Sequence, residues 1–108
     1  MSPEQVRGQP ADQRSDVFSF GAIFYEMLAG CSAFARDSAV ETGYAILNDD
    51  PPLFPAGVPA TLRRLVERCL AKRPEDRFQS AHELVDALAS ASGEGAPVQG
   101  LASLHRAQ

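Results

Sequence analysis

The chain has 108 residues, of which 44% are hydrophobic, and its 14 acidic against 10 basic side chains give a formal net charge of −4. This length fits one domain, and the apolar fraction is that of a folded globular protein rather than of a disordered one. The mild acidity excludes a dedicated polyanion binder on charge alone. Cys31 and Cys69 lie far apart with no C-x-x-C pair. This spacing argues against a disulfide scaffold or a thiolate zinc site and favours a reducing cytoplasm.

Neither a secretory signal nor a membrane span is predicted. Polar residues follow Met1, where a signal would need a basic region and an apolar stretch. The one candidate span, residues 17–35, carries Glu26 near its centre. An acidic side chain there is unfavourable by about 2.5–3.5 kcal/mol. We interpret this stretch as a deeply buried helix of a soluble protein.

Signals for helices recur along the chain, and signals for strands are nearly absent. Residues 2–5, S-P-E-Q, are a typical helix start, with a serine cap, proline at the first helical position and glutamine reaching back. Ser15 and Asp16 are expected to open a second helix over residues 16–29, which Gly30 ends. This helix is apolar on nearly every side and should be enclosed by other elements. Its large apolar residues are Val17, Phe18, Phe20, Ile23, Phe24, Met27 and Leu28.

Two more capping boxes, at residues 38–41 and 80–83, predict further helices. The first is followed by an apolar pattern at Val40, Tyr44 and Leu47. Residues 48–59 contain four prolines and should form an irregular connector. A helix that Pro74 ends is indicated by Leu62, Leu65, Val66, Cys69 and Leu70. The last helix is expected to pack through Ala81, Leu84, Val85 and Leu88.

These elements predict an all-α fold of about five helices around the central helix 16–29. From about residue 90 the composition turns to Ala, Ser and Gly. We therefore predict a folded unit over residues 1–90 and a disordered tail or linker over residues 91–108. The sequence has no internal repeat.

Four short motifs stand in a fixed order along the chain. They are S-P-E at residues 2–4, D-V-F-S-F-G at 16–21, G-C-S-A-F at 30–34 and P-E-D-R at 74–77. Together they resemble the A-P-E, D-x-W-S-x-G, G-x-x-P-F and P-x-x-R motifs in the C-terminal part of a protein kinase large lobe. The serine variant of A-P-E is typical of bacterial, eukaryotic-like serine/threonine kinases. The resemblance covers residues 1 to about 90, and it depends above all on Ser2, Pro3, Glu4, Asp16, Gly21 and Arg77.

The resemblance implies roles for several of these residues. Glu4 and Arg77 would form a largely buried ion pair, since a buried carboxylate needs a partner and arginine offers a two-pronged one. Asp16 would be stabilised by the helix N-terminus, and in the family it also accepts hydrogen bonds from the catalytic loop. The floor of the protein-substrate groove would comprise Met1, Ser2, Gln5 and the helix within residues 37–48.

The resemblance also implies ATP and Mg²⁺ for the full-length family, but this chain lacks the parts that bind them. It has no G-x-G-x-x-G, H-R-D or D-F-G, and its one lysine, Lys72, lies in a late helix. We therefore predict no catalytic, cofactor-binding or metal-binding residue, and no kinase activity of this chain alone. His82 is expected to be a solvated surface residue and Cys69 a core residue.

Two alternatives remain open. Residues 60–80 are locally basic, which suits an acidic partner or nucleic acid, but we favour a solvated face with Arg77 turned inward and expect no nucleic acid. The chain is also interpretable as a non-catalytic helical interaction module, with a partner kinase bound by lobe swapping. In either case, the nearly all-apolar helix should leave a sizeable apolar patch exposed. The predicted location is the cytoplasm.

Overall fold

The computed structural model describes residues 1–92, which form five α-helices and a short 3-10 helix and contain no strand. The elements are α1 (Pro3–Val6), α2 (Gln13–Ala29), α3 (Ala39–Asn48), α4 (Ala60–Cys69), η1 (Pro74–Asp76) and α5 (Ala81–Ser92). The predicted all-α fold of about five helices is confirmed. The helix α5 continues to Ser92, and the rest of the predicted tail lies outside the described residues.

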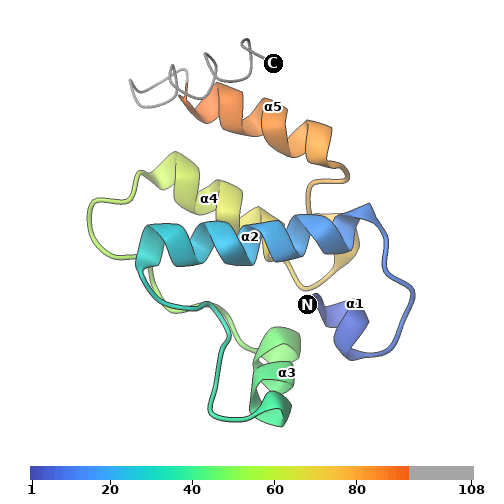
Figure 1. The fold of residues 1–108 in the computed structure, drawn as a ribbon. Helices are drawn as coiled ribbons and strands as arrows, with labels where there is room; N and C mark the ends of the chain where they lie inside the picture. Colours follow the sequence, from blue (N-terminus) through green and yellow to red (C-terminus); the bar gives the residue numbers. More distant parts are fainter. Residues whose placement is uncertain (93–108) are drawn as a thin grey trace.

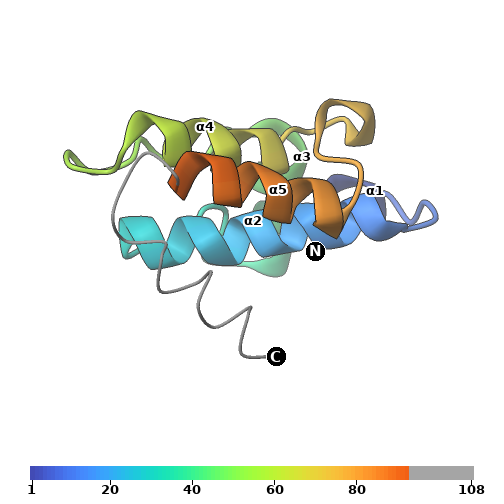
Figure 2. The same ribbon diagram turned by 90° about the horizontal axis from the view of Figure 1, so that it is seen from above.

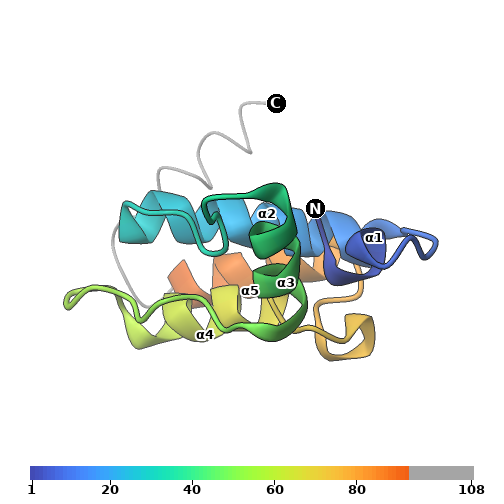
Figure 3. The same ribbon diagram turned by 90° about the horizontal axis from the view of Figure 1, so that it is seen from below.

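The central element is α2. Figure 1 shows α4 and α5 on one side of it and α1 and α3 on the other. Seen from above, α5 lies between α2 and α4, and it packs against both (Figure 2). Seen from below, α3 runs crosswise to α2 (Figure 3), and α1 packs against α3. None of the helices over residues 1–92 is long and apolar enough to span a membrane.

Side chains of α2 enter two separate buried clusters. Phe18 and Tyr25 join the first, and Val17 joins the second. The other buried members of the first cluster are Ala33, Phe34, Ala45, Ile46, Val66 and Leu70. The other buried members of the second are Leu65, Cys69, Phe78 and Leu84. Because α2 contributes to both clusters, it joins α3 on one side to α4 and α5 on the other.

The local start and stop signals are largely confirmed, with one correction. Ser38 and Ser80 each accept a hydrogen bond from a backbone N–H at 3.1 Å, and Gly30 ends α2 with a left-handed φ of 77°. However, α2 begins at Gln13 rather than at residue 16. The Asp12 carboxylate accepts from Arg14 N–H at 2.8 Å, so an acidic cap stands one turn earlier than we predicted.

The segments around α4 also follow the prediction in part. The connector before α4 is irregular. Of the five apolar residues predicted there, Leu65, Val66, Cys69 and Leu70 are in the core, whereas Leu62 is half-buried. The end of α4 differs from the prediction, because α4 stops at Cys69 and Pro74 instead starts the 3-10 helix η1. Proline at the first position of a helix is favourable because its missing N–H is not needed there.

One side of α2 is not covered by the described residues. Phe20, Ile23 and Met27 are 43%, 60% and 78% exposed. Their i, i+3, i+7 spacing places them in one stripe along the helix. The expectation that this helix is enclosed on nearly every side therefore fails at Phe20 and Ile23 among residues 1–92, because α2 buries the opposite face. The expected exposed apolar surface is present, and we call these three residues the α2 stripe.

Periodicity gave the wrong buried face for α3 and part of α5. In α3, Val40 and Tyr44 are 84% and 63% exposed, whereas Ala45 and Ile46 are buried. The Ala45–Ile46 face is the one that meets the core cluster, so the more conspicuous apolar residues point away from it. In α5, Leu84 is buried as predicted, but Val85 is half exposed.

Gly21 allows α2 and α4 to approach closely. A Cβ atom placed on Gly21 would lie 2.5 Å from the Cβ atom of Cys69, a distance that real side chains do not tolerate. Gly43 in α3 is different, since a Cβ atom there would lie 3.5 Å from Val6 Cγ1, an ordinary contact. Both glycines are inside helices, so they differ mainly in the space around them.

We predict that Gly21→Ala lowers the free energy of unfolding by about 1–3 kcal/mol, because the new methyl group overpacks the α2–α4 contact. The matched control is Gly43→Ala, which should be neutral or stabilising by up to about 1 kcal/mol through helix propensity alone. Urea unfolding followed by circular dichroism measures both. Equal effects of the two substitutions would contradict the steric role of Gly21.

Candidate functional site

The site begins with α1, a helix of four residues that depends on its cap. Gln5 N–H donates to Ser2 Oγ at 3.4 Å, and Ser2 N–H donates to Gln5 Oε1 at 2.9 Å. Pro3 occupies the first helical position, where no N–H is required. The predicted helix start is confirmed in both halves of this reciprocal cap. The cap holds α1 with Glu4 turned into the protein.

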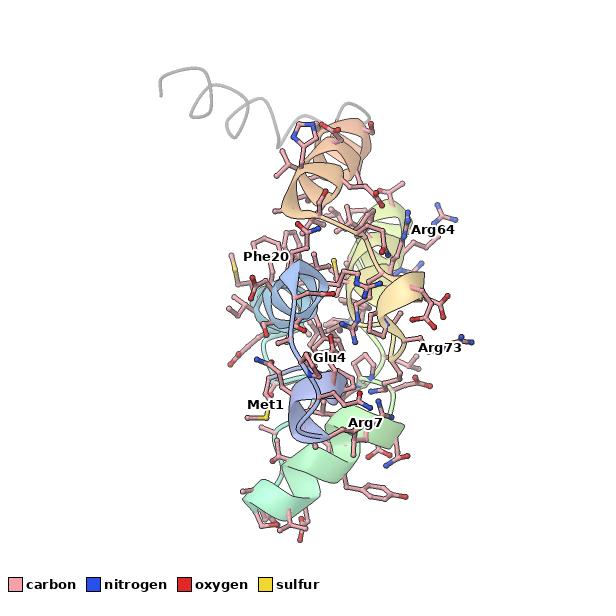
Figure 4. The ribbon with its side chains drawn as sticks, turned by 90° about the vertical axis from the view of Figure 1, so that its right-hand side faces the viewer. Met1, Glu4, Arg7, Phe20, Arg64 and Arg73 are labelled. Atoms are coloured by element: carbon pink, nitrogen blue, oxygen red, sulfur yellow. The ribbon has the colours of Figure 1, made fainter. Side chains whose placement is uncertain are left out.

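Glu4 meets Arg77 in a two-pronged, buried ion pair. Arg77 Nη1 lies 2.8 Å from Glu4 Oε2, and Arg77 Nη2 lies 2.9 Å from Glu4 Oε1. The Arg77 side chain is fully buried and that of Glu4 is 7% exposed. Figure 4 shows Glu4 between α1 and α2, turned toward the interior. The ion pair that the sequence predicted between these two residues is present.

The remaining donors of Arg77 are also used. Its Nε donates to Ala71 O at 2.7 Å, and its Nη1 and Nη2 donate to Arg14 O and Lys72 O at 3.0 and 3.1 Å. Ser15 Oγ donates to Glu4 Oε2 at 2.7 Å. No buried side-chain polar atom among residues 1–91 lacks a hydrogen-bond partner. One guanidinium therefore ties together α1, the first turn of α2 and the segment after α4.

This environment keeps Glu4 ionised. Hydrogen bonds from Arg77 lower the pKa of Glu4 from 4.5 to about 2, against the opposing effect of burial and with help from Ser15. Cys69 shows the reverse, since burial raises the pKa of its thiol to about 12. Cys69 is fully buried, which confirms it as a core residue. His82 is 88% exposed and lies 3.5 Å from Asp86, as expected of a surface residue.

The residues predicted for the substrate groove separate into two kinds. Met1 is 70% exposed and Gln5 is also at the surface, whereas Ser2 is fully buried in the cap. Ser2 therefore supports this surface and does not line it. The neighbouring helix α3 adds Val40 and Tyr44, one turn apart on one face. We call Met1, Gln5, Val40 and Tyr44 the α1–α3 surface.

Asp16 does not cap α2, because Asp12 takes that position. It lies exposed in the first turn, and its side chain makes no hydrogen bond to any of residues 1–92. The first turn of a helix still favours its charge. The further role that the resemblance gives to Asp16 stays a prediction. Sequence reasoning missed Asp12 and the inward turn of Ser15, although a D-x-x-S pattern at residues 12–15 was there to indicate a cap.

Exposed apolar side chains and exposed basic side chains lie on different sides of the molecule. Figure 4 shows Met1 and Phe20 on one side, with Arg64 and Arg73 on the other. Two basic side chains of this region are paired: Arg73 with Glu75 at 2.7 Å, and Arg68 with Glu83 at 3.1 Å. Arg68 also lies over the Phe78 ring. Among residues 1–92, no three His, Cys, Asp or Glu side chains are grouped so that they could hold a metal ion.

Comparison with known proteins connects this geometry to a family. A model of the protein kinase domain matches residues 1–88. The serine/threonine-protein kinase PknB of Mycobacterium tuberculosis is 44% identical over 87 residues, which cover 78% of this chain and 14% of that protein. A probable serine/threonine-protein kinase of Clostridium acetobutylicum is 36% identical over 93 residues, with 83% and 14% covered. The chain thus spans only 14% of the length of these two relatives.

A solved structure supports the fold. The kinase region of twitchin from C. elegans matches with a TM-score of 0.73 and 23% sequence identity. The match covers 79% of this chain and 16% of the other. At this identity the likeness speaks for the fold alone, and it agrees with the helical arrangement around α2.

We predict strong energetic coupling between Glu4 and Arg77. Glu4→Gln and Arg77→Met should each lower the free energy of unfolding by about 3–5 kcal/mol, because each leaves a buried partner uncompensated. The free energy of unfolding of the double variant should fall by much less than the sum of the two single losses. The control is the exposed pair Arg73–Glu75, whose coupling should stay below about 1 kcal/mol. Additive losses in the cycle for Glu4 and Arg77 would contradict the role of the pair.

The lowered pKa of Glu4 predicts a loss of stability in acid. A carboxylate whose folded pKa lies below its unfolded value stabilises the protein above the unfolded value, near 4.5, and ceases to do so as the pH falls toward about 2. Urea unfolding midpoints measured between about pH 6 and pH 2 should therefore fall most steeply in that window. Glu4→Gln should flatten this part of the profile. An unchanged slope in the variant would assign the acid sensitivity to other carboxylates.

Proposed function

The chain belongs to the protein kinase family, and from this we propose that it forms the helical, substrate-facing part of the large lobe of a bacterial-type serine/threonine kinase. The family activity is transfer of the γ-phosphoryl group of ATP to a protein serine or threonine. The observation that carries the proposal is the buried Glu4–Arg77 pair, which joins the S-P-E segment to the P-E-D-R segment as the motifs require. We also propose a cytoplasmic location, which the free thiols of Cys31 and Cys69 favour.

We further propose that this chain alone transfers no phosphate. The sequence contains no G-x-G-x-x-G, H-R-D or D-F-G motif, which in kinases hold the phosphates, the substrate hydroxyl and Mg²⁺. Residues 1–92 contain no group of three His, Cys, Asp or Glu side chains that could hold a metal ion, and the ammonium of Lys72 is bonded to backbone carbonyls. In a whole kinase of this family, we propose that ATP and Mg²⁺ are bound by the segments that carry those motifs.

The part of the reaction that this chain would serve is recognition of the protein substrate. The α1–α3 surface combines exposed Met1, just before α1, and polar Gln5 of α1 with exposed Val40 and Tyr44 of α3. The helices α1 and α3 pack directly against each other. Exposed Val40 and Tyr44 suit an apolar or aromatic side chain of a partner. The reciprocal cap and the Glu4–Arg77 pair hold α1 in place, so Met1 and Gln5 have a fixed support.

The α2 stripe favours a second role for the chain, as an interaction module. Phe20, Ile23 and Met27 present an apolar face that none of residues 1–92 covers. In a complete kinase lobe, we propose that other parts of the same domain pack on this face. In a short chain, the same face would bind a partner kinase segment by lobe swapping. Self-association that Ile23→Asp abolishes, without loss of helicity, would support this second role.

The kinase assignment predicts a clear contrast between two proteins. The purified chain should show no ATP-dependent phosphorylation of itself or of added protein substrates. A chimera in which residues 1–88 replace the matching segment of the M. tuberculosis relative, 44% identical, should keep kinase activity. Arg77→Met in the chimera should abolish most of it, whereas the surface change Arg64→Met should not. A folded but inactive chimera would contradict the assignment, and labelling by the chain alone would contradict its predicted inactivity.

A further inference from the structure

The C-terminal end of α3 has unfavourable electrostatics of its own. The helix has no basic residue in its last turn, and two acidic residues, Asp49 and Asp50, follow it directly. The C-terminal end of a helix carries partial negative charge, which favours cations and disfavours carboxylates. Arg36 reaches Asp49 only at 3.8 Å. A further cation at this end is therefore favourable.

Lys72 provides that cation from the segment after α4. Its Nζ donates to Ile46 O at 2.8 Å and to Ala45 O at 3.3 Å, the carbonyls that α3 presents in its last turn. Burial lowers the pKa of Lys72, while Asp50 and Asp49 act in the opposite direction. Its ammonium is therefore partly dehydrated, and the two carbonyls take the place of water.

Lys72 also ends a four-layer stack of charges and rings. Its Nζ lies 4.3 Å from the centre of the Phe34 ring. Phe34 is stacked on Phe18 at 5.7 Å and 14°, and the guanidinium of Arg77 lies 4.9 Å from the centre of the Phe18 ring. The two rings thus have a cation on each outer face. Arg77 Nη2 closes the arrangement by donating to Lys72 O at 3.1 Å.

We propose that Lys72 is a positioning residue for α3: through this stack it fixes the helix to the Glu4–Arg77 pair and so sets the geometry of the α1–α3 surface. Any effect of Lys72 on binding of a protein substrate rests on the function proposed above. The positioning of α3 by Lys72 does not depend on that function. The stack joins α3 to the same pair that holds α1. Both sides of the surface therefore share one support.

Amide hydrogen exchange of the free chain tests this proposal. Lys72→Met keeps an unbranched apolar stem but removes the charge and the donors. Amide exchange in the last turn of α3 should become about tenfold faster or more, because hydrogen bonds from a charged group are lost. This increase should be larger than any increase in α2 or α5. Lys72→Arg, which keeps the charge, should recover most of the protection. Arg64→Met is the control for losing an exposed positive charge and should change nothing in α3.

A spectroscopic readout accompanies the exchange experiment. The side-chain protons of Lys72 next to its ammonium should be shifted upfield by the Phe34 ring, and Phe34→Leu should remove that shift. If Lys72→Met does not fold, Lys72→Gln is measured in its place. Exchange that rises equally in all helices, or an unshifted Lys72 resonance, would overturn the proposal. The exchange and resonance measurements need neither ATP nor substrate. If the chimera with the M. tuberculosis relative were inactive, the proposed function would be refuted, but the positioning role of Lys72 would not.

Discussion

A guanidinium in the interior must have all its N–H groups paired, and Arg77 determines much of the structure for this reason. Its side chain is fully buried, and its donors reach Glu4, Ala71, Arg14 and Lys72. A buried pair of this kind adds little stability compared with well-packed apolar residues, but leaving either charge alone is strongly unfavourable. Alternative packings that separate α1 from the segment after α4 are therefore disfavoured. The ion pair in this way favours one packing of these elements over others.

The central helix α2 shows how one apolar sequence serves two different surroundings. Its inner face enters both core clusters and approaches α4 at Gly21, where no side chain fits. Its outer face carries the apolar α2 stripe, which is exposed among residues 1–92, in line with the polar residues Gln13 and Asp16. Apolar residues on all sides of a helix are typical of one enclosed by protein. The composition of α2 thus indicates a larger assembly than these residues supply.

What the sequence predicted well was local. Caps at Ser2, Ser38 and Ser80 and the glycine stop at Gly30 depend on neighbouring residues, and they were found. Which face of α3 is buried depends on distant partners, and Val40 and Tyr44 were more conspicuous than the buried Ala45–Ile46 pair. The pairing of Glu4 with Arg77 was predictable only through the resemblance to kinases. No local pattern indicates that Lys72 caps a helix that ends at Asn48.

The α1–α3 surface is built from helices of four and ten residues, which are too short to be stable in water by themselves. Their order must come from contacts with the rest of the chain. Those contacts converge on residues 71–77, where Arg77 binds Glu4 of α1 and Lys72 binds the last carbonyls of α3. This segment between α4 and α5, which contains η1, therefore acts as the scaffold of the surface. A substitution there should therefore change the geometry of the α1–α3 surface even though it lies outside that surface.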